Sequence, residues 1–151
     1  MSEPKLCLDH SVVIHIAKPS DLLDVFDLVD EYADGIKIEK GRTKQSLRDL
    51  VYSGQVMVFK YEETTIGGVA GYNSPCLFTD DVFYNVMFFY VRQQFRFLTK
   101  EIIKEMELVL LPTKVTKLVF GIPISKHSEK YKRYYKMMGY RELETHVYKR
   151  I

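Results

Sequence analysis

Four stretches of the chain place apolar residues three and four positions apart, which is the period of an amphipathic helix. In the first stretch, Leu22, Phe26 and Val29 would share one face. A capping residue, a glycine or a proline lies at the ends of the stretches, where helices commonly begin and end. The predicted helices run from Ser20 or Asp21 to about residue 33, then over 43–52 (capped by Thr43), 98–111 and 125–138.

Six other stretches are short and rich in β-branched or aromatic residues, which favour strands. The most apolar is VFYNVMFFYV at 82–91, which is too short to cross a bilayer as a helix and is predicted to be a buried central strand. Glycines bound 35–41, which is predicted to be a loop, and Asn73-Ser74-Pro75 is predicted to interrupt the sheet. The predicted strands are 11–17, 55–61, 65–72, 82–91, 117–122 and 140–151.

The order of these elements predicts one α/β domain over residues 1–151. Strands 55–61 and 65–72 are close enough in sequence to form an antiparallel hairpin. The helix between strands 82–91 and 117–122 is long enough for a right-handed parallel crossover. We therefore expect a mixed sheet with helices on its faces, and we expect strands 82–91 and 117–122 to separate near the start of that helix.

Charge, cysteine spacing and the amino-terminal segment argue against three kinds of function: nucleic-acid binding, metal binding and membrane insertion. The 151 residues are 46% hydrophobic, and 22 Lys or Arg against 20 Asp or Glu give a net charge of only +2. Such a charge gives little nonspecific attraction to nucleic acid, so nucleic-acid binding is not expected. Cys7 and Cys76 are far apart and outside any metal-binding spacing, so neither a metal site nor a disulfide is expected. The polar amino-terminal segment lacks the features of a signal peptide, which favours a cytoplasmic protein with no membrane segment.

The carboxy-terminal part contains a serine, two tyrosines and a glycine at a spacing that occurs in a known family. Tyr135 is followed four residues later by Gly139 and then by Tyr140, and Ser128 stands seven residues before Tyr135. In this order of elements, the spacing resembles the GNAT superfamily of N-acetyltransferases, in which an Asn commonly occupies the position of Ser128. The resemblance covers residues 11–151, and the last residues, from Tyr148, are similar to the family's closing strand. It implies a mixed, mainly antiparallel central sheet flanked by about four helices, and acetyl-coenzyme A (acetyl-CoA) as cosubstrate with an amine acceptor and no metal.

The family binds the pyrophosphate of the coenzyme on backbone N–H groups of a glycine-containing loop at the start of the third helix. A helix start offers such donors, and glycines allow close approach. Here the loop reads Gln94-Phe95-Arg96-Phe97-Leu98-Thr99, so Gln94 matches but Phe97 and Thr99 replace the small residues. A second alignment matches Val91 and Arg96 and again places Phe97 at a glycine position. Phosphate could still bind N–H groups of about Arg96 to Lys100, with help from the side chains of Arg92, Arg96 and Lys100. The resemblance assigns coenzyme contacts to Phe89, Tyr90, Val91, Gln94, Arg96, Phe97, Leu98, Thr99, Lys100 and Ser128.

The resemblance also makes Tyr135 the acid that protonates the leaving thiolate, and a phenol with an ordinary pKa near 10 stays protonated at neutral pH. The alternative is that its ring, like those of Tyr131 and Tyr134, only covers the sheet. No carboxylate lies in strand 82–91 to act as base. Asp80 and Asp81 precede that strand and fit a loop-capping role better than a water-holding one.

Three questions stay open from the sequence. The basic residues of 126–136 could meet the 3′-phosphate of the coenzyme or form a solvated helix face. The bulky loop favours a second function class, a catalytically inactive GNAT-fold interaction or structural protein, such as a phage virion component. A homodimer or another assembly partner is compatible with either class. Gly67, Gly68 and Gly71 lie within a predicted strand, where a bulge or tight packing is expected.

Overall fold

The computed structural model describes residues 12–34, 39–144, 146, 147 and 149–151 of the chain. Its contacts divide the chain into two compact units, Met1–Gly121 and Ile122–Ile151. The first unit holds the sheet, and the described residues of the second unit contain one helix, α4 (Ser128–Met137). Among the described residues, no helix has both the length and the apolar composition needed to cross a membrane.

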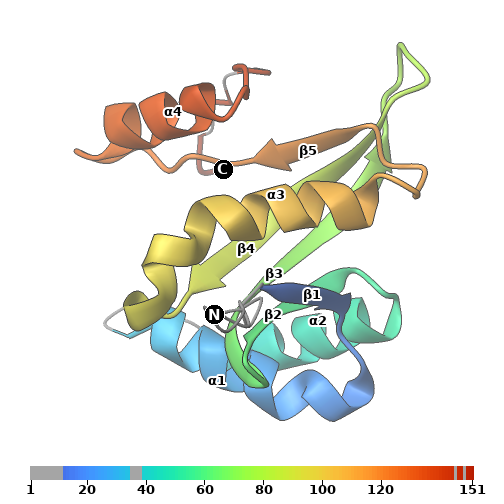
Figure 1. Ribbon diagram of the computed structural model, residues 1–151. Helices are drawn as coiled ribbons and strands as arrows, with labels where there is room; N and C mark the ends of the chain where they lie inside the picture. The colour runs from blue at the N-terminus through green and yellow to red at the C-terminus, as the bar shows by residue number, and fades with distance from the viewer. Residues whose placement is uncertain (1–11, 35–38, 145, 148) are drawn as a thin grey trace, which may run out of the picture. The chain divides into compact units, whose positions relative to one another are not determined.

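The first unit is built on a five-stranded sheet with the order β1-β2-β3-β4-β5 (Figure 1). Neighbouring strands are antiparallel, except that β4 and β5 are parallel. The predicted mixed, mainly antiparallel sheet is therefore confirmed. The strands are β1 (Val13–Ile16), β2 (Val56–Tyr61), β3 (Thr64–Pro75), β4 (Val82–Val91) and β5 (Lys117–Phe120).

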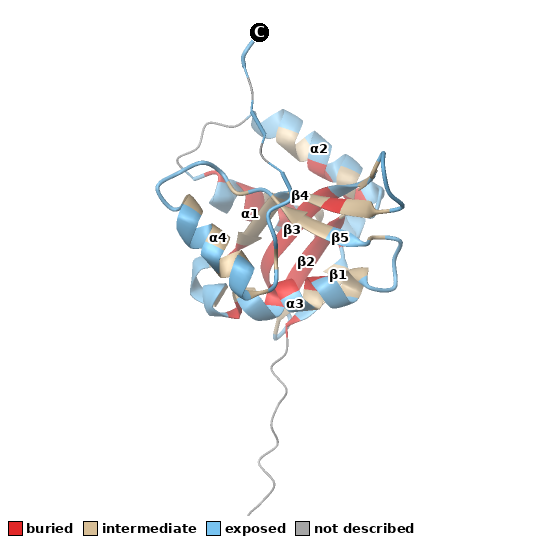
Figure 2. Cartoon of the chain, turned by 90° about the horizontal axis from the view of Figure 1, so that it is seen from above, coloured by how far each residue is buried: buried red, intermediate tan, exposed pale blue. Residues whose placement is uncertain are grey.

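Helices cover both faces of this sheet (Figure 1). Apolar residues of α1 and α2 pack on one face, and those of α3 pack on the other. Buried residues gather in the central strands between these layers, as Figure 2 shows. The helical segments, in which η marks a 3₁₀ helix, are η1 (Pro19–Asp21), α1 (Leu22–Tyr32), α2 (Lys40–Tyr52), η2 (Gln93–Leu98) and α3 (Thr99–Leu110).

The crossover through α3 forms as the sequence predicts. Ile102, Ile103 and Met106 of α3 are fully buried, and β4 and β5 on either side of the helix in the chain pair in parallel. The predicted hairpin of β2 and β3 is also present. Its two turn residues, Glu62 and Glu63, have φ angles of 49° and 67°. A two-residue turn of this left-handed kind normally takes Asn or Gly, so the turn is strained.

Close pairing of β3 and β4 explains the glycines of β3. A Cβ atom on Gly67 would lie 2.3 Å from the carbonyl oxygen of Tyr90, and one on Gly71 would lie 2.4 Å from that of Asn85. The register also shifts beside Gly71, because Ala70 pairs with Phe88 whereas Gly71 pairs with Val86. Both expected features, a bulge and tight packing, are therefore present.

Two predicted boundaries in the first unit are wrong. The second helix begins at Lys40 rather than Thr43, so the end of the predicted loop 35–41 is helical, while 35–38 lies outside the described residues. The predicted interruption at residues 73–75 is absent, because these residues continue the ladder with β4. Pro75 is tolerated as the last residue of β3, where its missing N–H interrupts no further pair.

The predicted closing strand is wrong for the residues that can be described. Of 140–151, residues 140–144, 146, 147 and 149–151 are described, and none of them is in a strand. Thr145 and Tyr148 lie outside the described residues. A strand needs a hydrogen-bonded neighbour, and the described part of the second unit supplies a helix instead. α4 itself ends one residue before Met138, and Gly139 follows with a φ of 91°.

Candidate functional site

The carboxyl half of β4 loses its neighbour on one side. Pairing with β5 covers only Phe83 to Val86, whereas pairing with β3 continues to Val91. β4 and β5 visibly diverge beyond this point in Figure 1. The expected separation of these two strands is confirmed, and residues 87–91 present one backbone edge that no described strand of the first unit covers.

A bulge marks the point where the strands separate. Met87 is the extra residue of β4 opposite Ala70 and Gly71, and 57% of its surface is exposed. A bulge of this kind bends a strand and turns its backbone groups. The bulge therefore changes the direction of the N–H and C=O groups of β4 at the first residue that has no partner in β5.

Side chains beyond the bulge lie on both faces of the sheet. Phe89 packs against Phe59 and against Phe120 of β5, with ring centroids 5.8 and 5.5 Å apart. Phe88 and Tyr90 lie on the opposite face, where both contact Tyr32 of α1.

Backbone groups alternate in direction as well, because Arg92 bonds to Ile66 of β3 and every second residue of β4 faces the same way. Of the predicted contact residues, Phe89 and Val91 therefore direct their N–H and C=O groups to the uncovered edge, and Tyr90 directs them to β3. The carbonyl of Val91 accepts a hydrogen bond from Nε of Arg96 at 3.4 Å. The side chain of Val91 is buried.

The segment that corresponds to the family's pyrophosphate loop is helical in this chain. Gln94, Arg96, Phe97 and Leu98 belong to η2, and Thr99 begins α3 directly after it. The N–H of Thr99 donates to the carbonyl of Arg96, and the Thr99 hydroxyl donates to the same oxygen at 2.7 Å. Leu98 is buried, whereas 75% of the surface of Phe97 is exposed.

The helical conformation of η2 changes which backbone N–H groups are free to bind a phosphate. In a 3₁₀ helix each N–H bonds to the carbonyl three residues earlier, and the N–H of Phe95 already bonds to Arg92 at 2.9 Å. The N–H groups of Arg96 to Thr99 therefore point along the helix, contrary to the expectation that they could bind phosphate. The helix start leaves the N–H groups of Gln93 and Gln94 directed outward instead. The sequence did not indicate Gln93, because nothing in it showed that helix would begin five residues before Leu98.

Arg92 has a structural partner. Its Nε atom donates to both carboxylate oxygens of Glu31, at 3.0 and 3.2 Å, and its Nη1 atom donates to the carbonyl of Thr65 at 2.7 Å. Its backbone N–H donates to Ile66. Arg92 therefore links the end of β4 to α1 and β3. Because its guanidinium group already has these partners, the structure does not support the expectation that it assists phosphate binding. Arg96 and Lys100 are exposed.

The other two predicted residues lie in the second unit. Ser128 supports the start of α4, since its hydroxyl lies 2.8 Å from the carbonyl of Pro123 and accepts the N–H of Ser125 at 2.7 Å. Tyr135 lies in α4, with its ring centroid 5.9 Å from that of Tyr134 and 5.6 Å from that of Tyr140. Burial, with a smaller contribution from Tyr134 and Tyr131, raises the pKa of Tyr135 to about 12. Its phenol therefore stays protonated across the physiological range.

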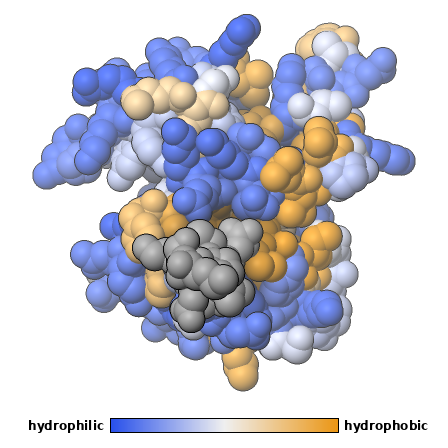
Figure 3. Space-filling view, viewed as in Figure 1, coloured by the Kyte–Doolittle hydropathy of each residue, from blue (hydrophilic) through white to orange (hydrophobic). Residues whose placement is uncertain are grey.

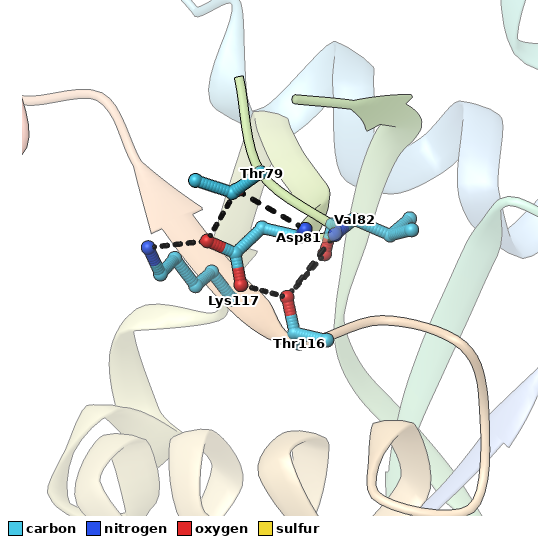
Figure 4. A network of polar contacts seen from close by, with 5 residues as sticks. All are labelled: Thr79, Asp81, Val82, Thr116 and Lys117. Carbon is cyan, nitrogen blue, oxygen red and sulfur yellow. Dashed lines mark hydrogen bonds and ion pairs between the residues drawn. The ribbon is translucent and has the colours of Figure 1, made fainter. Parts of the chain in front are cut away.

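Asp81 immediately precedes β4 and links the segment before this strand to the segment that begins β5 (Figure 4). Its carboxylate accepts hydrogen bonds from Lys117 at 2.8 Å and from the hydroxyls of Thr79 and Thr116 at 2.9 Å. These bonds lower its pKa to about 2. A carboxylate so strongly satisfied is a poor proton acceptor at neutral pH, and the geometry fits the loop-capping role.

Comparison with known proteins identifies the fold. No family model and no curated protein matches the sequence, but many solved structures match the chain in fold. A possible acetyltransferase from Clostridium difficile 630 has a TM-score of 0.75 at 11% identity, over 93% of this chain and 97% of its own. An aminoglycoside acetyltransferase from an uncultured soil metagenomic sample, in complex with sisomicin, has a TM-score of 0.71 at 14% identity, over 95% and 98%. A GNAT family acetyltransferase from Staphylococcus aureus has a TM-score of 0.69 at 13% identity, over 93% and 99%. The chain therefore has the fold of the GNAT acetyltransferases.

Proposed function

We propose that the protein is an acetyl-CoA-dependent N-acetyltransferase that acts on an amine. The observation that carries this proposal is the uncovered backbone edge of β4 at residues 87–91, directly before the helical turn of η2. The pantetheine arm of coenzyme A contains two amide groups, and an amide chain can pair with an open strand edge as an added strand does. The shared fold supports the choice of an acetyl thioester.

The phosphate groups would be held at the start of η2. The N–H groups of Gln93 and Gln94 point away from the turn, and Arg96 and Lys100 add two exposed positive charges. This arrangement is a helix start with nearby cations, which suits a pyrophosphate group. The exposed ring of Phe97 lies on the same short turn and can cover apolar parts of the coenzyme. The hydroxyl of Ser128 already bonds to Pro123 and Ser125 at the start of α4, and a contact of this residue with the coenzyme stays a prediction.

Tyr135 would act on the leaving group. The amine nitrogen attacks the thioester carbonyl carbon, the carbon–sulfur bond breaks, and the proton lost by the amine balances the proton gained by the thiol. A phenol with a pKa of about 12 holds its proton more tightly than an ordinary thiol with a pKa near 8.5. Tyr135 would therefore stabilise the departing thiolate chiefly by donating a hydrogen bond.

A binding-only role is the second candidate, and the helical turn of η2 favours it. A helix with Phe97 at the exposed position offers fewer backbone donors than a glycine loop. In that case the protein would use the same fold as an interaction or structural component, for example in a virion.

Calorimetric titration with acetyl-CoA, followed by an acceptor screen, separates the two candidates. We expect one molecule to bind per chain with a dissociation constant of about 1 µM to 1 mM, the range in which enzymes commonly bind substrates. A panel of polyamines, aminoglycosides and peptide amino termini would then be scored by release of free thiol and by the mass of the acetylated product. Binding without turnover on any acceptor favours the binding-only role, and absence of binding contradicts the proposal.

A further inference from the structure

The positive charge of the chain is concentrated in the second unit. Residues 122–151 contain eight Lys or Arg and three Asp or Glu, whereas residues 1–121 contain fourteen and seventeen. The net charge of +2 is thus the sum of a net charge of −3 in the first unit and +5 in the second. The expectation that nucleic acid would not bind rests on that sum, and it does not apply to the second unit taken by itself.

Few of these cations are neutralised within the second unit. Lys132 lies 3.7 Å from Glu129 and 3.5 Å from Glu142, and His146 lies 3.0 Å from Glu144. These pairs use all three acidic residues of the unit. For the described residues, no carboxylate lies within ion-pair distance of the remaining cations, which are all exposed: Lys126, Lys130, Arg133, Lys136, Arg141, Lys149 and Arg150.

Helical geometry gathers three of these cations on one face of α4. At 3.6 residues per turn, Lys130, Arg133 and Lys136 fall within an arc of about 120° and span about 9 Å along the axis. The tyrosines of α4 lie on the opposite side, where Tyr134 and Tyr135 are half-buried. α4 therefore has a basic face and a tyrosine face, and Figure 3 shows a mostly hydrophilic surface over this helix.

A hollow at the end of α4 continues the basic face. Its volume is about 510 Å³, and it is lined by Lys136, Gly139, Tyr140, Arg141 and Glu142. The left-handed φ of Gly139 turns the chain after the helix, so that Arg141 lies beside Lys136. Two exposed cations thus flank a concave surface, and the carboxylate of Glu142 in its lining is directed to Lys132.

We propose that the basic face of α4 binds the phosphodiester backbone of a nucleic acid. The row of Lys130, Arg133 and Lys136 is long enough to meet two neighbouring phosphates of a single strand. Arg141 contacts a third phosphate across the hollow, which makes three phosphate contacts in all. The binding is independent of base sequence, because cations on one helix face reach phosphates rather than base edges.

A nucleic acid fits this face better than an anionic membrane does. A basic helix binds a bilayer by inserting the apolar side opposite its charges. In α4 that side carries Tyr134 and Tyr135, which are half-buried, and the more exposed ring of Tyr131. The exposed Met137 lies among the cations rather than opposite them, so α4 has charge and apolar surface on the same side instead of the opposed faces that insertion needs.

Fluorescence anisotropy with a labelled uridine oligonucleotide of about 20 nucleotides tests the proposal on the full chain. Three single-strand phosphate contacts predict a slope of about −2 for the logarithm of affinity against the logarithm of salt, or roughly 20-fold weaker binding at 200 mM than at 50 mM salt. The variant Lys130→Gln, Arg133→Gln, Lys136→Gln should bind at least about tenfold more weakly and with a shallower slope. The matched control is Arg42→Gln, Arg48→Gln, Lys114→Gln, which removes the same charge from exposed positions of the first unit and should bind as wild type does.

The outcomes are distinct. No binding at 50 mM salt, or equal weakening in both triple variants, overturns the proposal. Binding to phosphatidylserine vesicles without binding to the oligonucleotide also overturns it, and identifies a membrane surface instead. Displacement of the oligonucleotide by coenzyme A overturns it too, because the face would then belong to a coenzyme site. Failure of acetyl transfer has no bearing on any of these readouts.

Discussion

Replacing Gly67 by alanine should disturb the site through the strand that supports it. The added methyl carbon would lie 2.3 Å from the carbonyl oxygen of Tyr90 and 3.1 Å from the Cα atom of Val91. Both are backbone atoms, so relief requires β3 to move away from the end of β4. Overpacking of this kind costs about 1–3 kcal/mol, and a chain of this size loses about 2–4 °C of melting temperature per kcal/mol. We expect Gly67→Ala to melt about 2–12 °C below wild type.

Gly41→Ala is the matched control for this measurement. Gly41 lies in α2, and a Cβ atom there would have no neighbour within 4 Å. Alanine in a helix is favoured over glycine by up to about 1 kcal/mol, so this variant should melt at or slightly above the wild-type temperature. Differential scanning calorimetry on all three proteins provides the comparison. Equal melting of Gly67→Ala and Gly41→Ala would refute the close approach of β3 and β4 beside the site.

Four further predictions concern the site and its supports. Tyr135→Phe should lower turnover roughly 100-fold with little change in acetyl-CoA affinity, as measured by steady-state kinetics and calorimetry; unchanged turnover would assign the ring to packing alone. Glu31→Gln removes a partly exposed ion pair with Arg92, so we expect a loss of about 1 kcal/mol in thermal unfolding and weaker acetyl-CoA binding, and unchanged values for both would contradict the fastening role of this pair. Glu63→Gly should raise the melting temperature by about 2–4 °C, because glycine adopts the left-handed turn without strain. The pKa of Asp81 is lowered from 3.8 to about 2, so its carboxylate stabilises the fold above pH 4, and the difference in melting temperature between wild type and Asp81→Asn should shrink as the pH falls from 4 to 2.

The sequence predicted the elements whose periodicity is strong, and it failed where a partner strand decides the structure. The pattern of Ile102 and Met106 is enough to define α3, because a helix satisfies its own backbone. The last predicted strand had only rough alternation, and whether it forms depends on a neighbour that the pattern does not reveal. The same reason explains the end of β3, where Asn73 and Pro75 favour a turn locally but pair with β4.

The separation of β4 and β5 was predictable, but the backbone and side-chain contacts around it were not. The resemblance placed it at the end of β4 and the start of α3, where the structure shows the uncovered edge. It did not show that a loop without glycine would become a 3₁₀ helix, which moves the open N–H groups from Arg96 back to Gln93. It also did not show that Arg92 would bind Glu31, since that contact joins residues 61 positions apart. Contacts of this range depend on the folded sheet and leave no local signal in the sequence.

Amide chemical shifts of the nitrogen-15-labelled protein, recorded during titration with acetyl-CoA, test the central claim most directly. Pairing of the coenzyme with the uncovered edge of β4 should perturb the amides of residues 88–91 most strongly, together with those of Gln93 and Gln94. The amides of α2, on the other side of α1, should remain unchanged and serve as the internal control. Perturbations confined to α4 and the hollow after it, or none with acetyl-CoA at about 1 mM, would contradict a coenzyme site at the end of β4.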